Sequence, residues 1–162
     1  MLCGRKFSFI LLSVLLAVIS PAWAQSPSSP GVFHAFRLEP GQDLKIELTK
    51  FLQEKEISAC AVVTCVGSLT RANIRFANEP SGSVVDGPLE IIALTGCGGS
   101  GSWHLHLSVS DSRGRMTGGH LLDGCTVRTT AEIVIVELTE LDFQRVHDPK
   151  SGYPELVVEA KD

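Results

Sequence analysis

Three histidines lie close together in the second half of the chain, at His104, His106 and His120. A neutral imidazole nitrogen binds zinc at roughly 2.0–2.1 Å, and a zinc ion held by three protein ligands keeps one coordination position open. Such an ion polarises a carbonyl group or supplies hydroxide near neutral pH. These residue types therefore indicate metal chemistry, provided that the fold brings the three imidazoles together.

Two β-strands within residues 103–122 are predicted to position these histidines. In the first strand apolar residues alternate with His104, His106 and two serines, which places both histidines on one face. A three-residue loop ending in Gly114 would place His120 directly opposite His106, whereas a two-residue loop would turn it to the apolar side. Glycine suits the left-handed position of a type I turn followed by a G1 bulge, which favours the longer loop. Directly opposed Cβ atoms lie about 4.5–5.5 Å apart, so the sequence predicts a three-histidine metal site.

Other interpretations of these histidines stay open from spacing alone. His104 and His106 are also typical of the polar face of an exposed strand, and glycines at positions 118 and 119 would allow His120 to bulge away. A fourth histidine, His34, is expected to be an ordinary strand residue and not a further ligand.

Glu132 is the candidate catalytic residue. It lies in a strand predicted over residues 126–138, among threonines and β-branched apolar residues. If Glu132 faces the metal, it can orient a ligand or act as a general acid or base. If it lies on the polar face, it is a solvated charge.

Residues 1–24 are predicted to be a signal peptide. Arg5 and Lys6 precede an apolar run over residues 7–19, and Ala-Trp-Ala at positions 22–24 fits a cleavage site. The run is shorter than the roughly 20 residues that a membrane span needs. We therefore expect a secreted or otherwise exported protein, with no membrane attachment once the signal is removed.

The charge balance disfavours a nucleic-acid partner. The 162 residues include 14 basic and 18 acidic ones, and removal of residues 1–24 would leave 12 basic ones against the same 18. A net acidic domain has no general attraction for a phosphate backbone.

Export would leave four cysteines, and oxidising conditions would permit disulfides. Cys60 and Cys65 lie in one predicted strand, about 16 Å apart, and bridged Cα atoms lie within about 7 Å, so these two cannot pair. Two pairings with Cys97 and Cys125 remain. Four buried free thiols are the equally weighted alternative.

The remaining chain reads as one domain over residues 32–160, after a flexible Ser/Pro-rich lead-in at 25–31. Residues 44–52 carry apolar side chains at helical spacing. Residues 58–66 are typical of a strand buried on both faces, ended by glycine at position 67. Further strands are expected at 32–38, 72–77, 89–95 and 156–159, and a flexible glycine-rich loop at 96–102.

Several segments together resemble a known family, the plants-and-prokaryotes-conserved (PPC) domain. Besides the histidine hairpin, they are Phe-Arg-Leu-Glu-Pro-Gly-Gln-Asp-Leu at 36–44, Val-Gly-Ser-Leu at 66–69, Glu-Ile-Ile-Ala-Leu-Thr-Gly at 90–96, Thr-Thr-Ala-Glu-Ile-Val-Ile at 129–135 and Ser-Gly-Tyr-Pro-Glu-Leu at 151–156. The resemblance implies an α+β domain, a mostly antiparallel sheet with one or two packed helices, that assembles as a homotrimer.

The resemblance also bears on the metal and on DNA. Prokaryotic members with this histidine pattern resemble metal binders, which here implicates His104, His106 and His120. The fold is similar to that of acetolactate decarboxylase, whose zinc is held by a His-X-His pair and a later histidine, so zinc is the expected metal. Plant members carry AT-hooks and lack the triplet. Here the string Arg-Gly-Arg at 113–115 ends in Met116 instead of proline.

Two functional hypotheses follow. The first is a zinc-dependent lyase or hydrolase acting on a small molecule, with decarboxylation of an oxo-acid or hydrolysis as the reaction. The second is a non-catalytic trimeric binding or interaction module. DNA binding, as in plant relatives, stands third.

Overall fold

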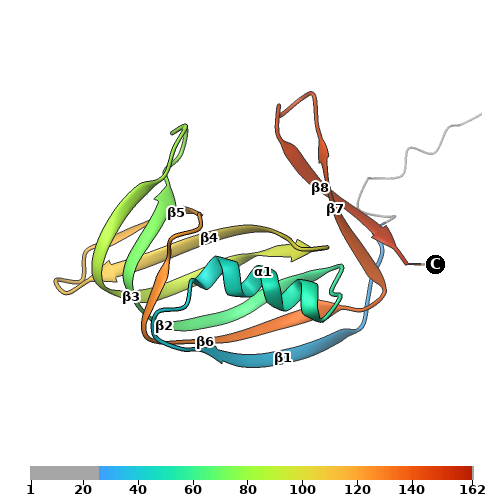
Figure 1. The fold of residues 1–162 in the computed structure, drawn as a ribbon. Coiled ribbons are helices and arrows are strands. Elements are labelled where there is room, and N and C mark those ends of the chain that lie inside the picture. Colours follow the sequence, from blue (N-terminus) through green and yellow to red (C-terminus); the bar gives the residue numbers. More distant parts are fainter. Residues whose placement is uncertain (1–25, 162) are drawn as a thin grey trace, which may run out of the picture.

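The computed structural model describes residues 26–161, so the predicted signal peptide at 1–24 lies outside the described residues. Within them the chain forms one helix and eight strands (Figure 1). In chain order these are β1 (Gly31–Leu38), α1 (Leu44–Glu54), β2 (Cys60–Arg75), β3 (Ser83–Gly99), β4 (Ser102–Asp111), β5 (Met116–Leu121), β6 (Thr126–Leu138), β7 (Leu141–His147) and β8 (Pro154–Ala160).

Six strands form one antiparallel sheet in the order β1-β6-β2-β3-β4-β5. The sheet curls, because the end of β2 also pairs with β5. Strands β7 and β8 form a separate hairpin that stands away from the sheet (Figure 1). Among residues 26–161, no helix is both long and apolar enough to cross a membrane.

Helix α1 covers one face of the sheet through its apolar stripe (Figure 1). Leu44, Leu48 and Leu52 are buried, as the helical spacing predicts. The helix begins after Asp43, whose carboxylate accepts hydrogen bonds from the first free backbone N–H groups of the helix. The same carboxylate accepts a hydrogen bond from the N–H of Gly124, at 2.7 Å, and so joins the helix start to the chain before β6.

The described chain is thus a mostly antiparallel sheet with a single helix, which confirms the predicted class only in part because strand dominates. The two strands predicted at 58–66 and 72–77 are one strand, β2, that continues through Gly67. Here glycine does not end the strand. A Cβ at Gly67 would overlap the backbone carbonyl of Thr130 on β6, so the residue permits close strand approach.

Two further expectations from the sequence are wrong. Strand β2 is not buried on both faces, since Val63 and Val66 are about half exposed. The predicted loop at 96–102 is mostly strand, because β3 runs to Gly99 and turns only at the next two residues. The terminal strand predicted at 156–159 is confirmed within β8.

All four described cysteines are free, in agreement with the free-thiol alternative. Cys60, Cys65 and Cys125 are buried and pack as small apolar residues of the core. Burial raises the pKa of the Cys60 and Cys65 thiols to about 12 and that of Cys125 to about 11, which keeps them protonated.

Substituting Gly96 tests how closely β3 and β4 must approach beside the histidines. A Cβ at Gly96 would overlap the carbonyl oxygen of His104, and the backbone φ of 144° disfavours any side chain. We expect Gly96→Ala to lower the free energy of unfolding by about 3 kcal/mol, measured by urea denaturation. Gly41→Ala is the control, because φ is 87° there but the space is open. Equal effects of the two variants would contradict the close approach.

Candidate metal centre

The β4–β5 hairpin places His106 directly opposite His120. Its loop has three residues: the N–H of Gly114 donates to the carbonyl of Asp111 at 2.9 Å, and the N–H of Asp111 donates to the carbonyl of Arg115 at 3.0 Å. Gly114 has a φ of 75°, the left-handed conformation that the sequence predicts for this position. The longer loop and the histidine register are therefore confirmed.

The three imidazoles form a compact group. One ring nitrogen from each of His104, His106 and His120 lies within 4.8 Å of the other two, and the ring centroids are 5.1 to 5.8 Å apart. Nitrogens bound to one tetrahedral zinc lie about 3.4 Å apart, a difference that side-chain rotation can close. The group can therefore hold a metal ion.

Regular strand alternation separates this group from the core. Leu105 and Leu107 are buried, while His104 and His106 on the same strand are exposed. His120 comes from β5 and is partly buried. The three histidines therefore lie on an ordered sheet surface, whose backbone hydrogen bonds restrict their relative positions.

The surroundings of His104 and His120 lower the pKa of both imidazoles, which favours their neutral form. Burial lowers the pKa of His120 to about 4, with further contributions from His104 and the positive charge of Arg75. Burial also lowers the pKa of His104, assisted by the positive charge of Arg145. A metal binds only the neutral imidazole, so both shifts prepare the group for a metal at neutral pH.

One unsatisfied atom tests whether the group suits a metal. Nδ1 of His120 is buried and has no hydrogen-bond partner within residues 26–161. A buried polar atom without a partner destabilises the fold, and metal coordination or an added hydrogen-bond donor or acceptor would remove this penalty. The donor set is three imidazoles, which suits zinc and other divalent transition metals. The residues therefore fit a metal of this class.

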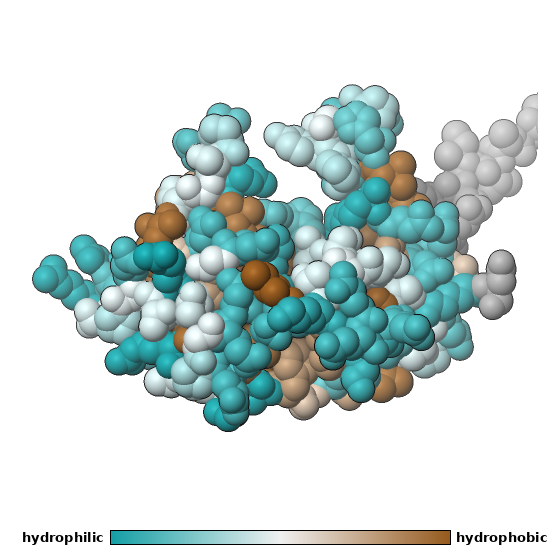
Figure 2. Space-filling view, in the orientation of Figure 1, coloured by the Kyte–Doolittle hydropathy of each residue, from teal (hydrophilic) through white to brown (hydrophobic). Residues whose placement is uncertain are grey.

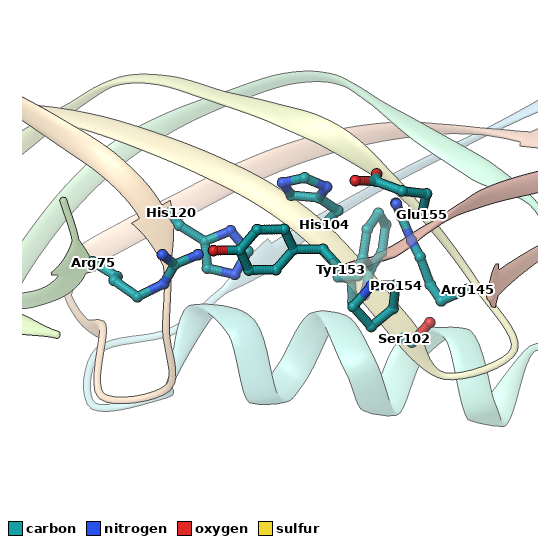
Figure 3. Close-up of a pocket in the computed structure, with 9 residues that line it drawn as sticks. Arg75, Ser102, His104, His120, Arg145, Tyr153, Pro154 and Glu155 are labelled. Carbon is teal, nitrogen blue, oxygen red and sulfur yellow. The ribbon is translucent and has the colours of Figure 1, made fainter. Parts of the chain in front are cut away.

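A pocket of about 430 Å³ adjoins His104 and His120 (Figure 3). Its walls come from the end of β2, the start of β4 and the β7–β8 hairpin, which projects beside a hollow in the molecular surface (Figure 2). The remaining lining residues are Arg75, Ser102, Trp103, Arg145, Tyr153, Pro154 and Glu155. No pattern in the sequence points to Arg75, Arg145 or Glu155, because local patterns do not show that strands distant in the chain meet at the hairpin.

Glu132 is not brought to the histidines. It is exposed on β6, paired with Arg37 on β1 and with Val66 on β2, and it does not line the pocket. Its catalytic role stays a prediction without structural support. His34 contacts Glu137 across β1 and β6, with 3.0 Å between Nε2 and Oε2, and lies outside the histidine group, as expected.

These features define a class of protein: a mainly β domain that carries three convergent histidines beside a pocket. Residues 25–139 match the Plants and Prokaryotes Conserved (PCC) domain, and the chain belongs to this family.

The chain is also similar to individual proteins. It is 40% identical to the bifunctional protein GlmU of Synechococcus sp. (strain JA-3-3Ab) over 152 residues, which are 88% of this chain and 24% of that protein. The chain thus spans about a quarter of the curated relatives it matches.

Two solved structures show the same fold. A hypothetical protein from Salmonella cholerae-suis superposes with a TM-score of 0.82 at 41% identity, covering 84% of this chain and 99% of that one. A metal-containing protein from Archaeoglobus fulgidus superposes with a TM-score of 0.66 at 24% identity, covering 78% and 93%.

The depressed pKa of His120 predicts a pH-dependent stability of the metal-free protein. Because the folded pKa of about 4 lies below the ordinary value of 6.5, the unfolded chain takes up the proton first. The contribution of neutral His120 to the free energy of unfolding is fully present above about pH 6.5 and is lost as the pH drops towards 4. We expect a lower urea midpoint at about pH 5 than at about pH 7, with a smaller difference in His120→Gln. An unchanged difference in that variant would contradict the assignment.

Proposed function

We propose that this protein binds zinc through His104, His106 and His120 and presents the ion to a small molecule in the adjoining pocket. The observation that carries the proposal is the convergence of three ring nitrogens within 4.8 Å of one another. The similar protein from Archaeoglobus fulgidus is a metal-containing protein, which supports the proposal. When bound, zinc would supply Lewis-acid polarisation of a carbonyl or ester group.

The reaction class that suits this site is that of a lyase or hydrolase, and the chain's own residues supply the rest of the chemistry. His104 and His120 face the pocket, so they orient the ion towards it. Glu155 is the carboxylate among the lining residues. We assign to Glu155 the acid/base role that the sequence had suggested for Glu132, because a proton-transfer group must lie within reach of the reacting atoms.

An exposed apolar surface favours the second candidate function, a trimeric binding module. Cross-strand pairing places Phe33, Val66 and Val136 on the sheet face opposite the helix. Phe33 is 67% exposed and Val66 is 51% exposed. Exposed apolar patches of this kind mark protein–protein contacts, and we propose that this face joins copies of the chain in a homotrimer.

Both candidate functions, the zinc enzyme and the binding module, include the homotrimer, and only the first includes catalysis. Turnover of oxo-acids and esters by the zinc-loaded protein, abolished by a chelator, would establish the enzyme over the binding module. We further propose that the protein is exported after removal of residues 1–24. We also propose that it has no role in DNA binding, because an acidic chain has no general attraction for a phosphate backbone.

Removing single histidines tests the metal site. We expect the wild-type protein to bind about one zinc per chain, and His104→Ala and His120→Ala to lose most of it, since two imidazoles rarely retain zinc in water. Zinc at about 100 times its Kd should raise the free energy of unfolding of the wild type by about 2.7 kcal/mol. Elemental analysis and thermal unfolding measure both effects.

His34→Gln is the matched control for zinc binding, because His34 is a partly buried strand histidine outside the group. It should bind zinc like the wild type. Full zinc content in both alanine variants would refute the proposed site.

Charge placed on the apolar face tests the assembly. Phe33→Glu should convert the trimer to monomers, because a buried, unpaired carboxylate strongly destabilises an interface. Light scattering coupled to gel filtration measures the mass. Ile46→Glu is the control, since Ile46 is a 41% exposed apolar residue of α1, on the helix side of the sheet. Dissociation by both variants, or by neither, would count against this face as the interface.

A further inference from the structure

We infer that the pocket beside the histidines binds a small organic acid, whose negative charge is stabilised by Arg75 and Arg145 on either side while an oxygen of the same molecule faces the imidazoles. This inference rests on the proposed function for its metal, although the arginines themselves require no metal. It assigns a substrate class, the 2-oxo or 2-hydroxy carboxylic acids, to a site that the histidines alone leave chemically open.

The two arginines come from different parts of the chain and meet at one pocket. Arg75 is the last residue of β2 and pairs with His120 on β5. Arg145 lies in β7, more than 20 residues after the histidine hairpin. Figure 3 shows them on opposite sides of the pocket, Arg75 near His120 and Arg145 near Glu155. A ligand between them would therefore lie against the imidazoles.

Neither guanidinium forms a direct ion pair with a carboxylate of the described residues. Within residues 26–161, no ion pair includes Arg75 or Arg145, although both side chains are partly buried. Neither donates to a carboxylate: Arg75 donates to the backbone carbonyl of Glu79, and Arg145 to the sulfur of Cys97, each at 3.5 Å. A partly buried guanidinium gains more from an anion than a solvated one does, because the surrounding dielectric is lower.

The more exposed arginine nearby behaves differently. Arg71, four residues earlier on β2, contacts the carboxylate of Asp86 at 3.2 Å. The protein has more acidic than basic residues, so carboxylate partners are plentiful. Arg113 and Arg128 also form no ion pair within residues 26–161, but both are exposed, whereas the two arginines of the pocket are partly buried. The planar fork of arginine matches a carboxylate.

The other walls favour a carbon skeleton over an inorganic anion. Trp103, Tyr153 and Pro154 line the pocket and offer apolar surface. The volume of about 430 Å³ lies near the lower end of ligand pockets, which suits a small molecule. Glu155 offsets one of the two positive charges, so the side chains favour an acid of low charge. An organic acid with one carboxylate and a short apolar group meets all three conditions.

Isothermal titration calorimetry with 2-oxoisovalerate tests this assignment on the purified protein, with and without added zinc. We expect binding by the zinc-loaded wild type and none of the methyl ester, which lacks the negative charge. Arg75→Met and Arg145→Met should each weaken binding by about tenfold or more, the usual effect of losing a charge-assisted hydrogen bond. Arg145→Lys should recover part of the affinity, because the charge is retained.

Arg71→Met is the matched control, an arginine of the same strand outside the pocket, and should bind the acid like the wild type. Zinc content and circular dichroism of each variant show that the fold is intact. Wild-type affinity in both pocket variants would overturn the inference, as would arginine-dependent binding of inorganic phosphate without binding of the acid.

Failure of the metal site is distinguishable from failure of the inference. If the wild type binds no zinc but still binds the acid through Arg75 and Arg145, the proposed metal function fails and the carboxylate site stands. If zinc binds normally and the acid does not bind at all, the carboxylate site is refuted and the metal site stands.

Discussion

The pairing register between β4 and β5 is the constraint on which the site depends. Side chains alternate between the two faces of a strand, so a slip of one residue would turn His120 towards the apolar core and leave His106 without its neighbour. The loop that ends in Gly114 sets this register, because its left-handed backbone allows three residues to close the hairpin. A local turn thus governs whether three imidazoles can meet one ion.

The curl of the sheet brings charged side chains from other strands to the histidine hairpin. Pairing of β2 with β5 brings Arg75 beside His120, and the β7–β8 hairpin adds Arg145 on the other side. Close backbone contacts permit this shape, since glycines inside β2 and β3 let neighbouring strands approach where a Cβ would overlap a carbonyl group. The histidine surface becomes the wall of a pocket only because strands far apart in the sequence converge there.

Sequence reasoning succeeded where the physical signal is local and failed where it is not. The histidine hairpin and α1 were predicted because alternation, turn chemistry and helical spacing act over a few residues. Gly67 and the glycines at 96–99 were misread, because glycine marks both a chain turn and a close approach between strands. The role of Glu132 stays a prediction, since a strand pattern does not show which part of the structure covers the face that carries this side chain.

The amino-acid sequence by itself determined the family, the helix and the facing histidines, because short-range backbone preferences and side-chain periodicity suffice for them. Only the tertiary structure decided that Arg75, Arg145 and Glu155 share a pocket with His104 and His120. Their meeting depends on the curl of the sheet and the direction of the terminal hairpin. Both arise from packing between segments distant in the chain, which no pattern within one segment records.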